Sequence, residues 1–118
     1  MFTGKISECE LASIVSRNWL NVHTSITEGW GYSILEASAR GTPTVAYEVP
    51  GVVNTIENGI NGLKIKDMDR ESFVNAAITI LSNPKQWQKS SRTFAENYSW
   101  DKTAEIWDPL IRNVIKKK

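Results

Sequence analysis

Two glutamates stand on either side of a glycine-rich turn, and this arrangement could hold a ligand that carries both sugar and phosphate groups. Seven residues separate Glu28 from Glu36, and the segment Gly29-Trp30-Gly31 lies between them. Glycines let a backbone approach a ligand closely, and the first amides of the helix expected after them, in 31–33, lack intrahelical partners and suit a phosphate. Glu36 could accept hydrogen bonds from the paired hydroxyls of a ribose. Glu28 could accept from sugar hydroxyls or stabilise positive charge at an anomeric carbon.

The same residues also have plain structural interpretations, which the sequence leaves open. Glu36 could pair with Arg40 at i, i+4 on a solvated helix face, worth about 0.3–0.5 kcal/mol. Glu28 could be a carboxylate favoured near a helix start, and the glycines could form an ordinary tight turn. The turn is not a dinucleotide-binding fingerprint, because Ile34 stands where the third glycine would be, and this argues against a dehydrogenase. His23 fits a packed or hydrogen-bonded residue better than a general base, because no triad partner accompanies it.

The composition limits the classes of protein that this chain can belong to. Its 118 residues, 41% of them hydrophobic, predict one soluble domain spanning 1–118. One cysteine and one histidine leave no set of ligands for a structural zinc site, so no metal is expected. A formal net charge of +1 argues against nucleic acid as a partner. The sequence shows neither a membrane-spanning stretch nor a signal-peptide core, which predicts a cytoplasmic or membrane-peripheral protein.

Short strands alternate with helices along the chain, and this alternation predicts how the glutamates are positioned. We expect helices over 8–17, 32–40, 71–81 and 84–98, and a last helix that begins at 99. Strands are expected over 19–23, 44–47 and 63–66. The pattern predicts an α/β fold, a Rossmann-like three-layer αβα arrangement with a short parallel sheet of about four strands. That is about half to two-thirds of a usual doubly wound sheet, so the domain is expected to be partial.

A resemblance to a known family adds to this interpretation. The stretch from Ser25 to Ala46, SITEGWGYSILEASARGTPTVA, resembles the donor-site signature of family 4 glycosyltransferases. The resemblance continues through Gly51 and 58–63, begins earlier at Phe2-Thr3-Gly4, and includes the lead-in Tyr98-Ser99-Trp100 to the last helix. In this family two Rossmann-like domains of a GT-B fold face each other across a cleft. The resemblance implies that the chain is part of the C-terminal, donor-binding domain, without the acceptor domain.

The resemblance also implies roles for individual residues. Glu28 is implied as the catalytic carboxylate that contacts the transferred sugar near the reacting carbon, and Glu36 as the carboxylate that binds the ribose. Backbone contacts to the sugar are implied for Gly29, Trp30 and Gly31. Backbone contacts to the phosphates are implied for Tyr32 and Ser33. The implied reaction transfers a hexose from a nucleotide-sugar to a glycan or lipid-linked acceptor with retention of anomeric configuration, without a divalent metal or cofactor.

The sequence departs from the family pattern in one respect. The phosphate-binding Arg and Lys of the family, and most of its base-binding segment, lie upstream of the position that matches Met1. The resemblance therefore implies a portion that is inactive alone, and an N-terminal glycosyltransferase subunit or self-association would cover its exposed sheet edge and last helix. The alternative is a non-catalytic interaction module that docks on another glycosyltransferase subunit. A third interpretation is another phosphate-binding α/β enzyme.

Overall fold

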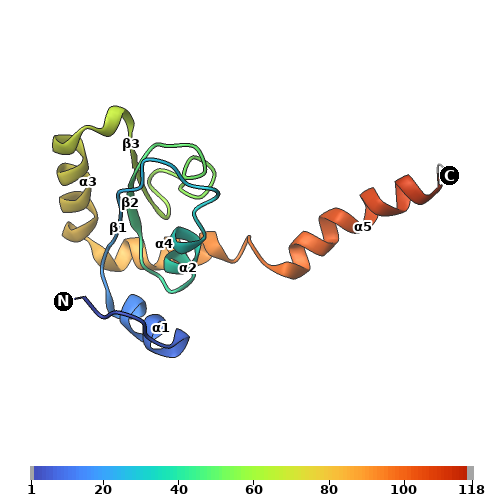
Figure 1. Ribbon diagram of the computed structural model, residues 1–118, viewed down its shortest axis with the longest axis horizontal. Helices are drawn as coiled ribbons and strands as arrows, with labels where there is room; N and C mark the ends of the chain where they lie inside the picture. Colours follow the sequence, from blue (N-terminus) through green and yellow to red (C-terminus); the bar gives the residue numbers. More distant parts are fainter. Residues whose placement is uncertain (1, 117–118) are drawn as a thin grey trace.

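A computed structural model describes residues 2–116, which alternate between helices and short strands (Figure 1). In chain order the elements are α1 (Glu8–Arg17), β1 (Asn21–His23), α2 (Tyr32–Ala39), β2 (Thr44–Tyr47), β3 (Gly62–Ile65), the 3-10 helix η1 (Lys66–Met68), α3 (Arg70–Ser82), α4 (Pro84–Ala95) and α5 (Trp100–Lys116). Every helix and strand that the sequence located by its range is present, with ends that differ by three residues or fewer.

The sheet is parallel, with the strand order β1-β2-β3. Val45 of β2 lies between Val22 of β1 and Leu63 of β3. The described residues form three strands, where the sequence predicted about four. β1 begins at Asn21, two residues after the expected start at 19. The carbonyl of Pro43 accepts the N–H of Asn21 at 2.8 Å, but Pro43 has no N–H with which to continue the pairing toward residue 19.

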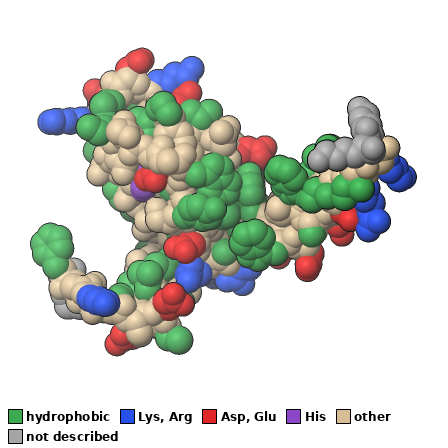
Figure 2. All heavy atoms as spheres, turned by 45° about the vertical axis from the view of Figure 1, so that its right-hand side comes forward, with side chains coloured by type: hydrophobic (Ala, Val, Ile, Leu, Met, Phe, Trp, Pro, Cys, Tyr) green, Lys and Arg blue, Asp and Glu red, His purple; other side chains and the backbone are tan. Residues whose placement is uncertain are grey.

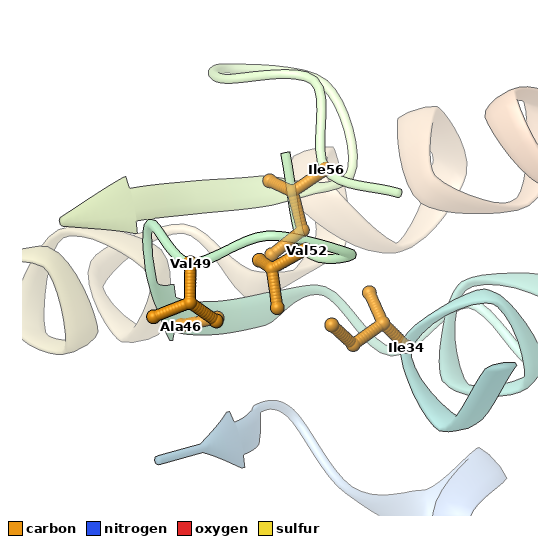
Figure 3. Close-up of a cluster of buried hydrophobic side chains, with 5 residues drawn as sticks. All are labelled: Ile34, Ala46, Val49, Val52 and Ile56. Carbon is orange, nitrogen blue, oxygen red and sulfur yellow. The ribbon is translucent and has the colours of Figure 1, made fainter. Parts of the chain in front are cut away.

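Successive residues of β2 face opposite sides of the sheet, and each side has its own core. Ala46 packs with four side chains on the α2 side, namely Ile34, Val49, Val52 and Ile56 (Figure 3). Val45 packs with three side chains of α3 on the other side, namely Phe73, Ala76 and Ile80. The three-layer αβα arrangement expected from the sequence is therefore confirmed, with α2 and α3 in the outer layers.

A buried asparagine holds the segment before β3. Asn61, which is fully buried, donates from its side-chain amide to the Ser38 hydroxyl at 3.1 Å and to the Thr55 carbonyl at 2.8 Å. Its side-chain oxygen accepts the Glu57 N–H at 2.8 Å. Asn61 therefore links α2 to the segment between β2 and β3.

Two helices lie at the periphery. No side chain of α1 is buried, and the end of α1 is tied to the body by a hydrogen bond of 2.7 Å from the Thr42 hydroxyl to the Val15 carbonyl. The last helix, α5, projects away from the sheet (Figure 1), and none of its side chains is buried. The exposure expected for its apolar face is therefore observed. Among residues 2–116, no helix is both long and apolar enough to cross a membrane.

Candidate functional site

The predicted site lies at the carboxyl edge of the sheet. β1 ends at His23 and β2 ends at Tyr47, so the segments 24–31 and 48–56 leave the sheet at the same edge. The first of these segments leads directly into the N-terminus of α2. Ligands of open α/β sheets bind outside the carboxyl ends of the strands, so the topology brings the residues singled out in the sequence to a suitable place.

Two glycines allow these segments to touch. Gly51 has a φ of +89°, and a Cβ there would overlap the carbonyl oxygen of Glu28. Gly31 has a φ of +81°, and a Cβ there would lie 2.8 Å from the Thr55 hydroxyl. Both positions combine a left-handed backbone with a close approach, which only glycine accommodates without strain. The segment after β2 therefore packs directly against the Glu28–Gly31 turn.

The N-terminus of α2 is open. Gly31 occupies the N-cap position and offers no side chain, and its carbonyl accepts the N–H groups of Ile34 and Leu35 at 3.0 and 3.3 Å. Within residues 2–116 no hydrogen-bond acceptor lies in reach of the N–H groups of Tyr32 and Ser33, and both residues are exposed. Unpaired amides at the positive end of a helix dipole favour a bound anion.

Glu28 lies beside the histidine that ends β1. Its side chain is 29% exposed, and Oε2 lies 3.2 Å from Nε2 of His23, whose side chain is 13% exposed. The two atoms are close, but their geometry does not make a hydrogen bond, and Nε2 has no other partner among the described residues. The other carboxylate oxygen of Glu28 accepts the Gly29 N–H at 3.2 Å. His23 is packed, as the sequence suggested, and its contact with Glu28 was not foreseen.

Glu36 presents an exposed side chain one turn into α2. The ion pair with Arg40 that the sequence left open is not formed, since neither residue takes part in an ion pair within the described part of the chain. Arg40 instead donates from Nη1 to the backbone carbonyl of Glu36 at 2.9 Å. The carboxylate of Glu36 is therefore available to a ligand.

An aromatic cluster holds the glycine-rich turn against the end of α4. The ring of Trp30 lies 5.0 Å from that of Tyr32 and 5.7 Å from that of Tyr98, measured between centroids. Tyr98 also contacts Phe94 and donates from its hydroxyl to the Asn54 carbonyl at 3.4 Å. Sequence reasoning missed this role of Tyr98, because nothing local links it to a residue 68 positions earlier.

Among residues 2–116, no group of three or more His, Cys, Asp or Glu side chains is arranged to hold a metal ion. The candidate site therefore consists of two carboxylates, the backbone amides between them and the aromatic side chains that hold the turn. Such a set can accept hydrogen bonds from hydroxyls on two sides and donate to an anion in the middle.

Comparisons with known proteins find similarity over most of the chain. The family described as "Glycosyl transferases group 1" matches residues 1–99. The chain is 31% identical over 102 residues to a poly(glycerol-phosphate) alpha-glucosyltransferase of Bacillus subtilis, covering 83% of this chain and 15% of that protein. It is also 31% identical over 108 residues to a D-inositol 3-phosphate glycosyltransferase of Corynebacterium urealyticum, covering 89% of this chain and 26% of that protein.

A solved structure has the same fold. The sucrose-phosphate synthase of Thermosynechococcus elongatus superposes on the whole of this chain with a TM-score of 0.83 and 28% sequence identity. The match covers 31% of that protein. The chain thus spans between about an eighth and a third of the relatives that it matches, since the share is 12% for a sucrose synthase of Melioribacter roseus.

Proposed function

We propose that this chain, which belongs to the glycosyl transferases group 1 family, binds the nucleotide-sugar donor of a retaining hexosyltransferase. In that reaction the bond between the anomeric carbon and the donor diphosphate breaks, and a bond forms between this carbon and an acceptor hydroxyl. The hydroxyl proton leaves with the diphosphate. The acceptor is a glycan or a lipid-linked acceptor, and the protein works in the cytoplasm or at the membrane periphery.

The observation that carries this proposal is the open N-terminus of α2 between two carboxylates. The N–H groups of Tyr32 and Ser33 have no acceptor in the described part of the chain, and they would donate to the donor phosphates. Glu36 would accept from the ribose hydroxyls, since it has no ion-pair partner there. The positions on both sides of the phosphates are thus suited to hydroxyl-rich groups.

The transferred sugar would lie against the turn before α2. Glu28 would contact it near the anomeric carbon, where a carboxylate stabilises developing positive charge. The backbone N–H groups of Trp30 and Gly31 would donate to the sugar hydroxyls. Gly29 would do the same after its N–H leaves the Glu28 carboxylate, to which it donates at 3.2 Å. Backbone amides and the helix dipole would balance the phosphate charge without a divalent metal.

The rest of the reaction needs parts that lie outside this chain. The chain spans 31% of the sucrose-phosphate synthase, and the acceptor side of the cleft would come from a further domain or an N-terminal subunit. Residues 1–118 alone would bind the donor and would not transfer the sugar. A second candidate function, a non-catalytic module that docks on another glycosyltransferase subunit, is favoured by the exposed apolar face of α5.

A titration of the chain with donors tests the proposal without any need for activity. Amide chemical shifts would be followed by NMR while UDP-, GDP- and ADP-hexoses are added. We expect shifts centred on residues 29–36. Glu36→Ala should weaken binding of the best donor about tenfold, because a hydrogen bond to a charged group is lost. Its free energy of unfolding should change by less than about 0.5 kcal/mol, since the side chain is exposed.

The matched control is Glu105→Ala, which removes an exposed helical glutamate from α5. Donor affinity should stay the same in this variant. If no donor shifts residues 29–36 at millimolar concentration, the donor-binding proposal is wrong for this chain and the docking function takes its place. If Glu36→Ala and Glu105→Ala bind equally well, the role of Glu36 is refuted.

A further inference from the structure

A basic pocket lies at the opposite end of α2 from the candidate donor site. Its volume is about 350 Å³, and it is formed between α1, α2 and α4. Four cationic side chains line it, namely Arg40, Lys85, Lys89 and Arg92. One carboxylate, Glu96, lines it as well. The whole chain has a formal net charge of only +1, so this concentration of positive charge is local.

The cations of this pocket form no ion pair in the described part of the chain. Lys85, Lys89 and Arg92 recur at helical spacing along α4, and the sequence of α4 contains no Asp or Glu. None of the four cations belongs to an ion pair within residues 2–116, where Arg112 is the Lys or Arg side chain that is paired, with Asp108. The pocket thus has four cations and one carboxylate, Glu96, with which none of them is paired, and a bound anion would offset the excess positive charge.

The two arginines are held in place by the end of α2. Arg40 donates from Nη1 to the Glu36 carbonyl at 2.9 Å, and Arg92 donates from Nη2 to the Arg40 carbonyl at 3.4 Å. Cations near a helix C-terminus are favoured by the helix dipole, which accounts for both arginines. Each guanidinium carries five N–H donors, so most of them stay available. The dipole does not account for Lys85 and Lys89, which lie on α4.

We propose that this basic pocket binds a phosphate-bearing anion. Positioned guanidinium groups match the oxygens of a phosphate in pairs, and lysines add point charges beside them. The hydroxyls of Ser16 and Thr93 also line the pocket and can donate. None of the donor-site residues, 28–33 and Glu36, lines this pocket, so the two sites differ and the inference does not rest on the proposed function.

A second pocket lies beside the basic pocket, and it suggests two kinds of molecule that could carry the phosphate. It has a volume of about 560 Å³, contains Ile60 and Phe94, and shares Lys85 and Lys89 with the basic pocket. The two lysines thus separate a polar pocket from a more apolar one. The phosphate can belong to a soluble anion, or to the headgroup of an anionic phospholipid whose apolar part lies in the second pocket. The test distinguishes these two sources.

The test uses the 118-residue chain and inorganic pyrophosphate, followed by NMR. We expect saturable shifts of the Gln88 and Thr93 amides, which weaken as the ionic strength rises. The double variant Lys85→Gln/Lys89→Gln should bind pyrophosphate about tenfold more weakly at these amides, because two charges of the site are lost. Shifts at Tyr32 and Ser33 should persist in this variant, so that anion binding at the N-terminus of α2 is scored separately.

The control Lys66→Gln/Lys116→Gln removes the same charge from exposed positions outside the pocket and should bind as the parent does. Sedimentation with vesicles of phosphatidylglycerol, compared with phosphatidylcholine, identifies the source. Binding to the anionic vesicles that is lost in Lys85→Gln/Lys89→Gln assigns a lipid headgroup, and pyrophosphate binding alone assigns a soluble anion. The proposal is overturned if neither probe binds at millimolar phosphate, or if the control loses as much affinity as the pocket variant.

Discussion

The position of Glu28 depends on a contact between two backbones. Gly51 follows β2 and lies directly against the carbonyl of Glu28, with no room for a side chain between them. The turn that carries Glu28 is therefore fixed from the segment after β2 as well as from its own strand. The role proposed for Glu28 needs such support, because catalytic and binding geometries tolerate displacements of only about 0.5 Å.

We predict that Gly51→Ala both destabilises the fold and weakens donor binding. The left-handed φ should cost about 1–2 kcal/mol, and the overlap with Glu28 about 1–3 kcal/mol more. Gly59→Ala is the matched control, because Gly59 has a φ of +85° and open space where its Cβ would lie. It should show only the smaller loss. Urea unfolding and the donor titration measure both effects, and equal losses in the two variants would refute the supporting role of Gly51.

At the scale of elements, the sequence predicts the helices well because their boundaries are local. Ser7 and Glu10 form the reciprocal cap that their spacing indicates, and Gly41 ends the region of α2 with a φ of +80°. The three strands were located, but the sheet was expected to have about four, since strand pairing joins distant residues and cannot be read locally. The candidate site shows the same limit of local information. Glu28 and Glu36 lie in one segment and could be picked out together, whereas the contact of Trp30 with Tyr98 depends on the packing of the whole domain.

The N-cap of α3 predicts how the stability of the protein depends on pH. The hydroxyl of Ser72 and the N–H of Glu71 donate to Asp69, and they lower the pKa of its carboxyl below the usual 3.8. A lowered pKa in the folded state stabilises the protein above the unfolded-state pKa of 3.8, and this contribution is lost as the pH falls through the lower, folded-state value. Asp69→Asn keeps a capping oxygen without the titration.

Asp69→Asn should therefore unfold with nearly the parent free energy at neutral pH and lose less stability than the parent between about pH 4 and pH 2. Urea unfolding across this range measures the difference. Asp101→Asn is the control, since Asp101 lies in the first turn of α5 and accepts no hydrogen bond among the described residues. A parent and an Asp69→Asn variant with the same acid dependence would contradict the assignment.

The shape of the whole molecule is set by α5. A compact domain of this length has a radius of gyration of about 13.5 Å, whereas this chain has 16.6 Å and extends over 55 Å in its longest direction. Hydrophobic side chains gather along the projecting helix (Figure 2). Trp107, Ile111 and Val114 are each more than half exposed and lie on one face. An apolar face of this kind marks an interaction surface.

The sequence of α5 indicates that this helix needs a partner. Pro109 lies inside it, where it removes one backbone hydrogen bond at a cost of about 3 kcal/mol, and most of the stability of a protein helix comes from the packing of its apolar face. We predict that the purified chain self-associates at micromolar concentration through this face and that its helix content rises with concentration. Trp107→Glu/Ile111→Glu should remain monomeric and less helical, because it places charges on the apolar face.

The control variant Lys102→Gln/Lys116→Gln changes the net charge equally on the opposite face and should associate as the parent does. Sedimentation equilibrium measures the association state, and circular dichroism over the same concentrations measures the helix content. A monomeric parent with constant helix content would show that α5 is stable without a partner copy.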